Sequence, residues 1–132
     1  MPSVQIHVCD ETVGGDRSPG FTLDFLNERI TVRELIRERV YQEVREYNAQ
    51  SPTYLRSLVQ PTDAEATLNG YRLRKARKID WEEQYRLALD AFTRNGFFML
   101  VDDRQAESLD DEILVTPQTI VSFVKLTPLV GG

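Results

Sequence analysis

Residues 97–132 read FFMLVDDRQAESLDDEILVTPQTIVSFVKLTPLVGG, and this stretch decides which fold the sequence favours. It begins with an apolar run of strand length at residues 97–101, followed by a polar turn that contains two aspartates. Residues 119–126 are rich in Ile, Val and Phe and predict a final strand. The tail that follows, residues 127–132, ends in two consecutive glycines. This part of the chain is therefore expected to begin with one strand and to end with another, which is followed by a short tail with two terminal glycines.

The sequence between these two strands predicts only short elements. Asp102, Asp103 and Arg104 make a turn, and a short strand is expected near residues 105–106. Residues 108–113 read as a short turn or helical bend.

The beginning of the sequence predicts a β-hairpin. Residues 4–8 alternate apolar and polar side chains, which is the period of a strand with one buried face. A polar, glycine-containing loop covers residues 10–20, and residues 21–26 then alternate again. Two adjacent strands joined by a turn region form a hairpin in the simplest arrangement.

A helix is predicted to follow the hairpin. Thr31 and Glu34 have the spacing of a capping box, in which the threonine accepts from a first-turn amide and the glutamate reaches back. The expected apolar face consists of Val32, Leu35, Ile36, Val40, Val44 and Tyr47. The expected solvent face consists of Arg33, Arg37, Glu38, Glu43 and Glu46. This pattern is typical of a helix that packs one side on a sheet.

The centre of the chain is less regular. A short helix is expected around residues 53–59, in a segment interrupted by prolines and by Asn69-Gly70. A second helix is predicted from Asp80, with Glu83 as its capping partner and Asn95-Gly96 as its end. Its apolar face is expected to consist of Trp81, Tyr85, Ala88, Leu89 and Phe92.

Composition limits the class of protein. The 132 residues fit a single domain over residues 1–132, and a chain of this length needs no disulfide or metal to fold. Cys9 is the only cysteine, which excludes an internal disulfide and fits a reducing, cytoplasmic setting. The sequence has no apolar run of about 18 residues and no signal-peptide pattern, so no membrane association is expected. The net charge of −5 argues against nucleic acid as a partner.

Without residues 51–95, the order of the expected elements is similar to that of ubiquitin. In ubiquitin-like proteins a hairpin is followed by a main helix, and the last strand runs out into a tail that ends in two glycines. The resemblance implies an α+β, ubiquitin-like β-grasp fold with a mixed sheet packed on the main helix. Residues 51–95 would then be a helical insertion between the main helix and the third strand, and residues 127–132 a flexible tail.

Four local segments carry this resemblance. Residues 100–105 resemble the strand and turn of ubiquitin, with its later short turn matched at Ser108-Leu109, and residues 30–35 resemble the start of its helix. Gly131-Gly132 matches its terminus in position. The tail lacks arginines, and the central insertion lengthens the connection between the helix and the third strand. These two departures suggest a divergent, bacterial-type member that is read by its own dedicated enzymes.

The resemblance implies a protein modifier, which is a substrate of enzymes and not an enzyme itself. The Gly132 carboxylate would attack the α-phosphate of ATP held by a ubiquitin-activating-like enzyme, so the chain needs no cofactor of its own. The activated tail would then be joined to target proteins through an isopeptide bond. A conjugating enzyme and a deubiquitinase-like peptidase are the other partners that the resemblance implies.

The residue types of the tail suit a reaction inside a narrow channel. Gly131 and Gly132 have no Cβ, so their backbone can approach another protein closely. Pro128 donates no amide hydrogen bond and should end the pairing of the last strand, which keeps Leu129 and Val130 extended.

Two other functions use the same features differently. A sulfur carrier would be activated in the same way but would end in a thiocarboxylate. A plain β-grasp interaction module would leave the tail unused, with Gly131-Gly132 as a frayed end.

Further residues are candidates for contacts with other proteins. The resemblance places Leu100 where ubiquitin has an exposed apolar residue for partner recognition, although the surrounding apolar run favours burial. If the protein forms chains on itself, Lys75 and Lys78 are the expected acceptors, in a basic stretch that otherwise reads as a solvated loop.

No metal site is predicted. His7 and Cys9 share one side of the first strand, but the sequence offers no other histidine or cysteine to complete a site. The acidic residues match no calcium-loop spacing and read as a solvated turn. These residues are Asp102, Asp103, Asp110, Asp111 and Glu112.

Overall fold

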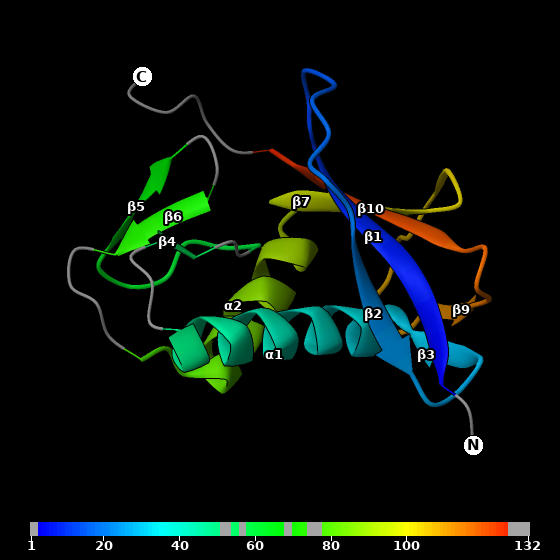
Figure 1. Ribbon diagram of the computed structural model, residues 1–132. Coiled ribbons are helices and arrows are strands. Elements are labelled where there is room, and N and C mark those ends of the chain that lie inside the picture. The colour runs from blue at the N-terminus through cyan, green and yellow to red at the C-terminus, as the bar shows by residue number, and fades with distance from the viewer. Residues whose placement is uncertain (1–2, 51–53, 56–57, 68–69, 74–77, 127–132) are drawn as a thin grey trace.

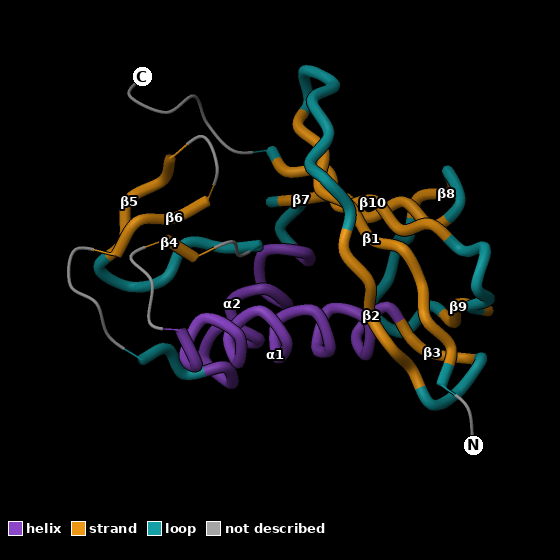
Figure 2. The backbone as a smooth tube through the Cα atoms, viewed as in Figure 1, coloured by secondary structure: helices purple, strands orange, loops and turns teal. Residues whose placement is uncertain are grey.

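The computed structural model describes residues 3–50, 54–55, 58–67, 70–73 and 78–126. This part of the chain is an α+β structure with two helices, a mixed five-stranded sheet, and separate sheets of three and two strands (Figures 1 and 2). Neither described helix is long and apolar enough to span a membrane.

The five-stranded sheet joins the two ends of the described chain. Its strands are β1 (Val4–Thr12), β2 (Phe21–Phe25), β7 (Phe97–Val101), β8 (Arg104–Gln105) and β10 (Ile120–Lys125). Their order is β2-β1-β10-β7-β8, in which β1 and β10 are parallel and the other neighbours antiparallel. The predicted hairpin and the strands at both ends of the 97–126 stretch are confirmed.

The first helix, α1 (Val32–Gln50), lies across one face of this sheet (Figure 1). Its predicted apolar face is confirmed, because all six of those side chains are buried. Thr31 Oγ1 accepts from the Glu34 amide at 3.1 Å, and the Thr31 hydroxyl itself donates to the Glu34 carboxylate. Glu34 thus reaches back to the capping hydroxyl of Thr31.

The region between the helices is more than a helical insertion. It forms a three-stranded small sheet of β4 (Tyr54–Leu55), β5 (Ala64–Thr67) and β6 (Gly70–Leu73), followed by α2 (Trp81–Thr93). The short helix expected at residues 53–59 is therefore wrong at β4, where pairing with β6 takes precedence over local preference. Helix α2 packs against α1 and β7.

The ends of α2 differ in detail from the prediction. Asp80 accepts from the Glu82 amide, as an N-cap does, whereas Glu83 accepts a hydrogen bond from Thr62 and takes no part in the cap. Asn95, and not the glycine that follows it, adopts the left-handed conformation, with φ of 61°. Gly96 instead approaches Ala91 so closely that a Cβ would lie 3.2 Å from its carbonyl oxygen.

A small two-stranded sheet was not predicted. Strand β3 (Arg29–Thr31) pairs with β9 (Glu112–Leu114), which overlaps the segment 108–113 that was expected to be only a turn or bend. The turn before β9 also satisfies the start of α1, because the amides of Val32 and Arg33 donate to the carbonyls of Asp111 and Leu109.

Alternation along the strands separates an inner face, toward α1, from an outer face. On the inner side, Ile6, Val8, Met99, Val121 and Phe123 are buried in a core shared with both helices and the small sheet. Strand β1 continues this pattern beyond its predicted end at residue 8, and its next inward residue is the buried Asp10.

Candidate functional site

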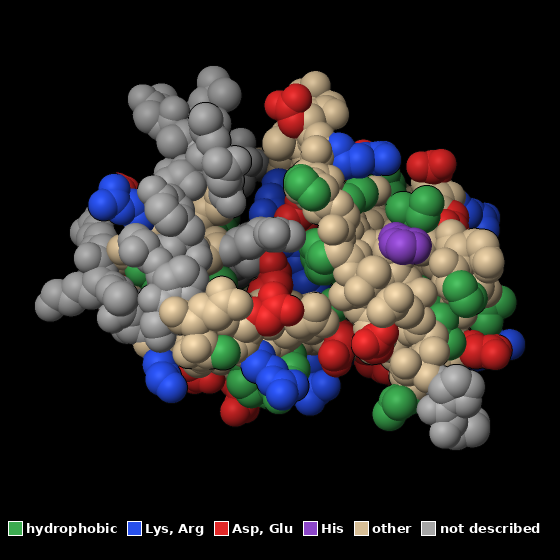
Figure 3. All heavy atoms as spheres, viewed as in Figure 1, with side chains coloured by type: hydrophobic (Ala, Val, Ile, Leu, Met, Phe, Trp, Pro, Cys, Tyr) green, Lys and Arg blue, Asp and Glu red, His purple; other side chains and the backbone are tan. Residues whose placement is uncertain are grey.

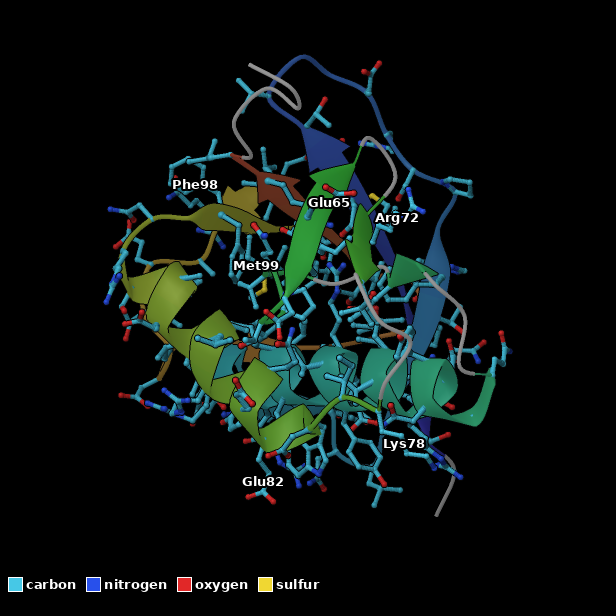
Figure 4. The ribbon with its side chains drawn as sticks, turned by 90° about the vertical axis from the view of Figure 1, so that its left-hand side faces the viewer. Glu65, Arg72, Lys78, Glu82, Phe98 and Met99 are labelled. Atoms are coloured by element: carbon cyan, nitrogen blue, oxygen red, sulfur yellow. The ribbon has the colours of Figure 1, made fainter. Side chains whose placement is uncertain are left out.

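The residues expected to react lie outside the described part of the chain. They are the tail residues Pro128, Leu129, Val130, Gly131 and Gly132, and the acceptor candidate Lys75. The other acceptor candidate, Lys78, is exposed just before α2 (Figure 4). The described residues that adjoin the tail are those at the end of β10.

The root of the tail is the end of β10 together with Leu126. The Leu126 amide donates to the Gly96 carbonyl at 3.4 Å, which ties the chain to the start of β7. Lys125, the last residue of β10, points to the inner face, where its Nζ lies 3.5 Å from Asp10 Oδ2. The last described residues before the tail are thus fixed to two neighbouring strands.

A buried ionic cluster lies behind this root, formed by Asp10, Arg39, Glu43 and Lys125. The Arg39 side chain is fully buried, and its Nη1 and Nη2 donate to the two oxygens of Asp10, at 2.8 Å for the Nη2–Oδ2 pair. Its Nε donates to Glu43 Oε1 at 2.9 Å. The bidentate geometry matches the planar guanidinium to a carboxylate, which is the strongest form of this pairing.

Aromatic rings complete the environment of Arg39. Its guanidinium carbon lies 4.5 Å from the centre of the Phe123 ring and 5.3 Å from that of Phe21. Both rings belong to the main sheet, so the cation is held between α1 and the sheet. The cluster therefore connects β1, α1 and β10 through polar contacts inside an apolar core.

Burial and mutual attraction act in opposite directions on these groups. Burial raises the pKa of Asp10, but Arg39 and Lys125 outweigh it and hold that pKa below its usual value. Burial lowers the pKa of Arg39, but Glu43 and Asp10 outweigh it and raise that pKa. Burial lowers the pKa of Lys125, and its partners oppose this effect only in part.

Glu43 is the incompletely paired member of the cluster. Burial raises its pKa, and the opposing attraction of Arg39 does not restore the ordinary value. Among the described residues, Glu43 Oε2 and the Tyr47 hydroxyl are buried without a hydrogen-bond partner. The prediction that Glu43 belongs to the solvent face of α1 is wrong, because Arg39 draws its carboxylate into the interface with the sheet.

Glu43 should give stability a specific dependence on pH. A raised pKa in the folded state means that the contribution of Glu43 is complete below its ordinary pKa of 4.5 and is lost as pH rises through the folded pKa. We expect the free energy of unfolding of the unaltered protein to fall relative to that of Glu43→Gln over this window, by at most about 1.4 kcal/mol per pH unit. Denaturant titrations from pH 4 upward measure the difference, and a difference that does not change with pH would contradict the prediction.

Sequence reasoning missed Arg39 and Asp10, although both carry a signal. Arg39 lies between Ile36 and Val40 on the apolar face of α1, four residues before Glu43, which is the spacing of a helical ion pair. Asp10 continues the inward alternation of β1. A charged residue that occupies a position on an otherwise apolar face indicates a buried partner of opposite charge.

Leu100 lies on the outer face of the sheet. It alternates with the buried Met99 and is itself half-buried, and it faces Ser122 of β10 and Gln105 of β8. Helix α2 does not cover it, because α2 contacts the inner side of β7 through the tilted ring pair of Phe92 and Phe97. The predicted burial of Leu100 is thus only partial.

Other apolar side chains accompany Leu100 on this face. Phe98 and Val124 are half-buried, and Ile120 is half-exposed beside His7, its partner across β1 and β10. Figure 3 shows hydrophobic side chains gathered around the single histidine. We call Phe98, Leu100, Ile120 and Val124 the outer-face patch.

The other residues considered as metal ligands in the sequence include several that make hydrogen bonds within the fold. Cys9 is buried with its Sγ 3.3 Å from Ser122 Oγ, while His7 is exposed on the same face of β1. Asp102 accepts from the Ile120 amide, and Asp111 accepts from the amides of Glu107 and Ser108. Within the described ranges, no group of three or more His, Cys, Asp or Glu side chains could hold a metal ion.

Comparison of the chain with protein-family models, with curated proteins and with solved structures found no match.

Proposed function

We propose that this protein is a ubiquitin-like modifier of β-grasp fold, activated by adenylation of its Gly132 carboxylate and joined to target proteins. The observation that carries the proposal is the position of β10. This strand occupies the centre of the main sheet beside β1, and the chain leaves it directly into a tail that ends in Gly131-Gly132.

The order of the elements supports the proposed fold. A hairpin of β1 and β2 is followed by α1 across one face of the sheet, and the final strand returns to the centre. The small sheet and α2 come between the main helix and β7, where an insertion was expected. This is the arrangement that a β-grasp domain with one enlarged connection would have.

The anchoring of β10 supports the proposed reaction. A carboxylate that must enter the active site of another protein needs a short, adaptable tail on a rigid base, because ordering a loose connection costs entropy. Lys125 is held by Asp10 and by pairing with β1 and β7, whereas Gly131 and Gly132 have the least restricted backbone of any residue type. The outer-face patch would serve for recognition by the conjugating enzyme or peptidase.

Intact mass spectrometry of the protein recovered from its native host tests this proposal. We expect covalent adducts with other proteins that are absent when Gly131 and Gly132 are deleted. The matched control is Leu26→Ala, which truncates an exposed leucine and leaves the whole tail in place. Tryptic peptides from the adducts should carry the tail of this protein on a target amine.

Two outcomes would contradict the modifier proposal. A mass gain equal to the difference between sulfur and oxygen, without protein adducts, would identify a sulfur carrier. Recovery of only free, unmodified protein, with no change of host phenotype on deletion of both glycines, would leave an interaction module as the better account.

A further inference from the structure

The small sheet lies beside the root of the tail. Figures 1 and 4 both show β5 and β6 next to the end of β10, on the side of the molecule where the β1–β2 hairpin projects. The charges of Arg39 and Asp10 act on the hydroxyl of Tyr71 in β6, whose pKa is raised chiefly by burial. Strand β6 therefore adjoins the same buried cluster that holds Lys125.

The two faces of the small sheet have different characters. Ala64, Tyr71 and Leu73 are buried and contribute to the common core, so they account for the packing of this sheet. Glu65 and Arg72 point the other way, face each other directly across β5 and β6, and are exposed (Figure 4). We call the exposed side that carries Glu65 and Arg72 the insertion face.

The length of the tail limits where a tail-binding enzyme can sit. Six residues, 127–132, follow Leu126. Fully extended, six residues reach at most about 22 Å. The active site of an enzyme that holds the Gly132 carboxylate must therefore lie within that distance of Leu126. The small sheet is one of the elements that flank this point.

We propose that the insertion face, through Glu65 and Arg72, is a docking surface for the enzyme that activates the tail. This inference rests on the proposed function and adds a specificity element to it. The enzyme would present an acidic group to Arg72 and a basic group to Glu65, since paired charges of opposite sign select a partner more than they add affinity. The insertion would then distinguish this modifier from others that share the same tail chemistry.

A charge swap on the full-length protein tests the docking surface. The variant Glu65→Arg with Arg72→Glu keeps the net charge and the cross-strand pair, so folding should be preserved. The matched control is Arg29→Glu with Glu112→Arg, which swaps an exposed ion pair between β3 and β9 at the other end of the molecule (Figure 1). Thermal melts should give both variants the midpoint of the unaltered protein.

The readout is ATP-dependent conjugate formation in an extract of the native host, measured against the concentration of each protein. We expect the insertion-face swap to raise the apparent KM at least tenfold while kcat stays within twofold, because docking changes and the reacting carboxylate does not. The control swap should leave both parameters within twofold. In addition, a truncated protein that lacks only Gly131 and Gly132 should competitively inhibit conjugate formation by the full-length protein. The same truncation of the insertion-face swap should not inhibit it.

The outcomes separate this inference from the function on which it rests. An apparent KM within twofold of the unaltered protein, with conjugates still formed, would overturn the docking surface and leave the modifier proposal standing. An equal rise of KM in both swaps would also overturn it, because the effect would not be local. Absence of ATP-dependent conjugates from the unaltered protein would overturn both proposals.

Discussion

Replacing Arg39 by alanine should lower the free energy of unfolding by about 3–5 kcal/mol. The substitution leaves Asp10 and Glu43 buried without the cation that binds both of them. A domain of this size has a total stability of roughly 5–15 kcal/mol, so the loss is a large part of the whole. Denaturant titration at neutral pH, followed by far-ultraviolet circular dichroism, measures it.

Arg33→Ala is the matched control on the same helix. Arg33 pairs with Asp110 at 3.3 Å, but the side chain of Arg33 is 43% exposed and that of Asp110 82%, so the pair should contribute no more than about 1 kcal/mol. Equal losses for the two variants would show that burial of the Arg39 cluster does not matter to stability. A loss below about 1 kcal/mol for Arg39→Ala would contradict the cluster itself.

Replacing Phe123 by alanine should lower the free energy of unfolding by about 3–5 kcal/mol. Its ring is fully buried in the centre of the sheet, packs 5.9 Å from the ring of Phe97, and lies against the Arg39 guanidinium. Removal leaves a cavity between β10 and α1 and also takes away an aromatic neighbour of the buried cation. The same denaturant titration measures the change.

Ile120→Ala is the control on the same strand. Ile120 is 50% exposed on the outer face, so its truncation should cost less than about 1 kcal/mol. A larger loss for Ile120→Ala than for Phe123→Ala would mean that the two faces of β10 have been assigned the wrong way round.

The regular elements could be predicted from the sequence because their signals are local. The 3.6-residue period of Val32, Leu35 and Ile36 and the capping pair at Thr31 and Glu34 define α1 within one short window. Alternation likewise defines β1 and β2, and the apolar runs define β7 and β10. The two left-handed residues Asp102 and Asp103 make the tight turn that the sequence also indicated.

Pairing between distant segments could not be predicted in the same way. Strands β3 and β9 are each three residues long and are separated by eighty residues, from Thr31 to Glu112, so neither has a usable period of its own. Strand β4 has only two residues and depends on β6 for its conformation. Short strands of this kind are decided by the partner that they meet and not by their own residues.

The sequence by itself therefore determined the two helices, the hairpin, the strands at both ends of the 97–126 stretch and the inward-facing apolar residues. Only the tertiary structure decided that Asp10, Arg39 and Lys125, which come from three different elements, meet in one buried cluster at the root of the tail. The physical reason is that a periodic pattern shows which side of an element is buried. Which charges meet on that side depends on the register between elements, and register is fixed by packing over the whole core.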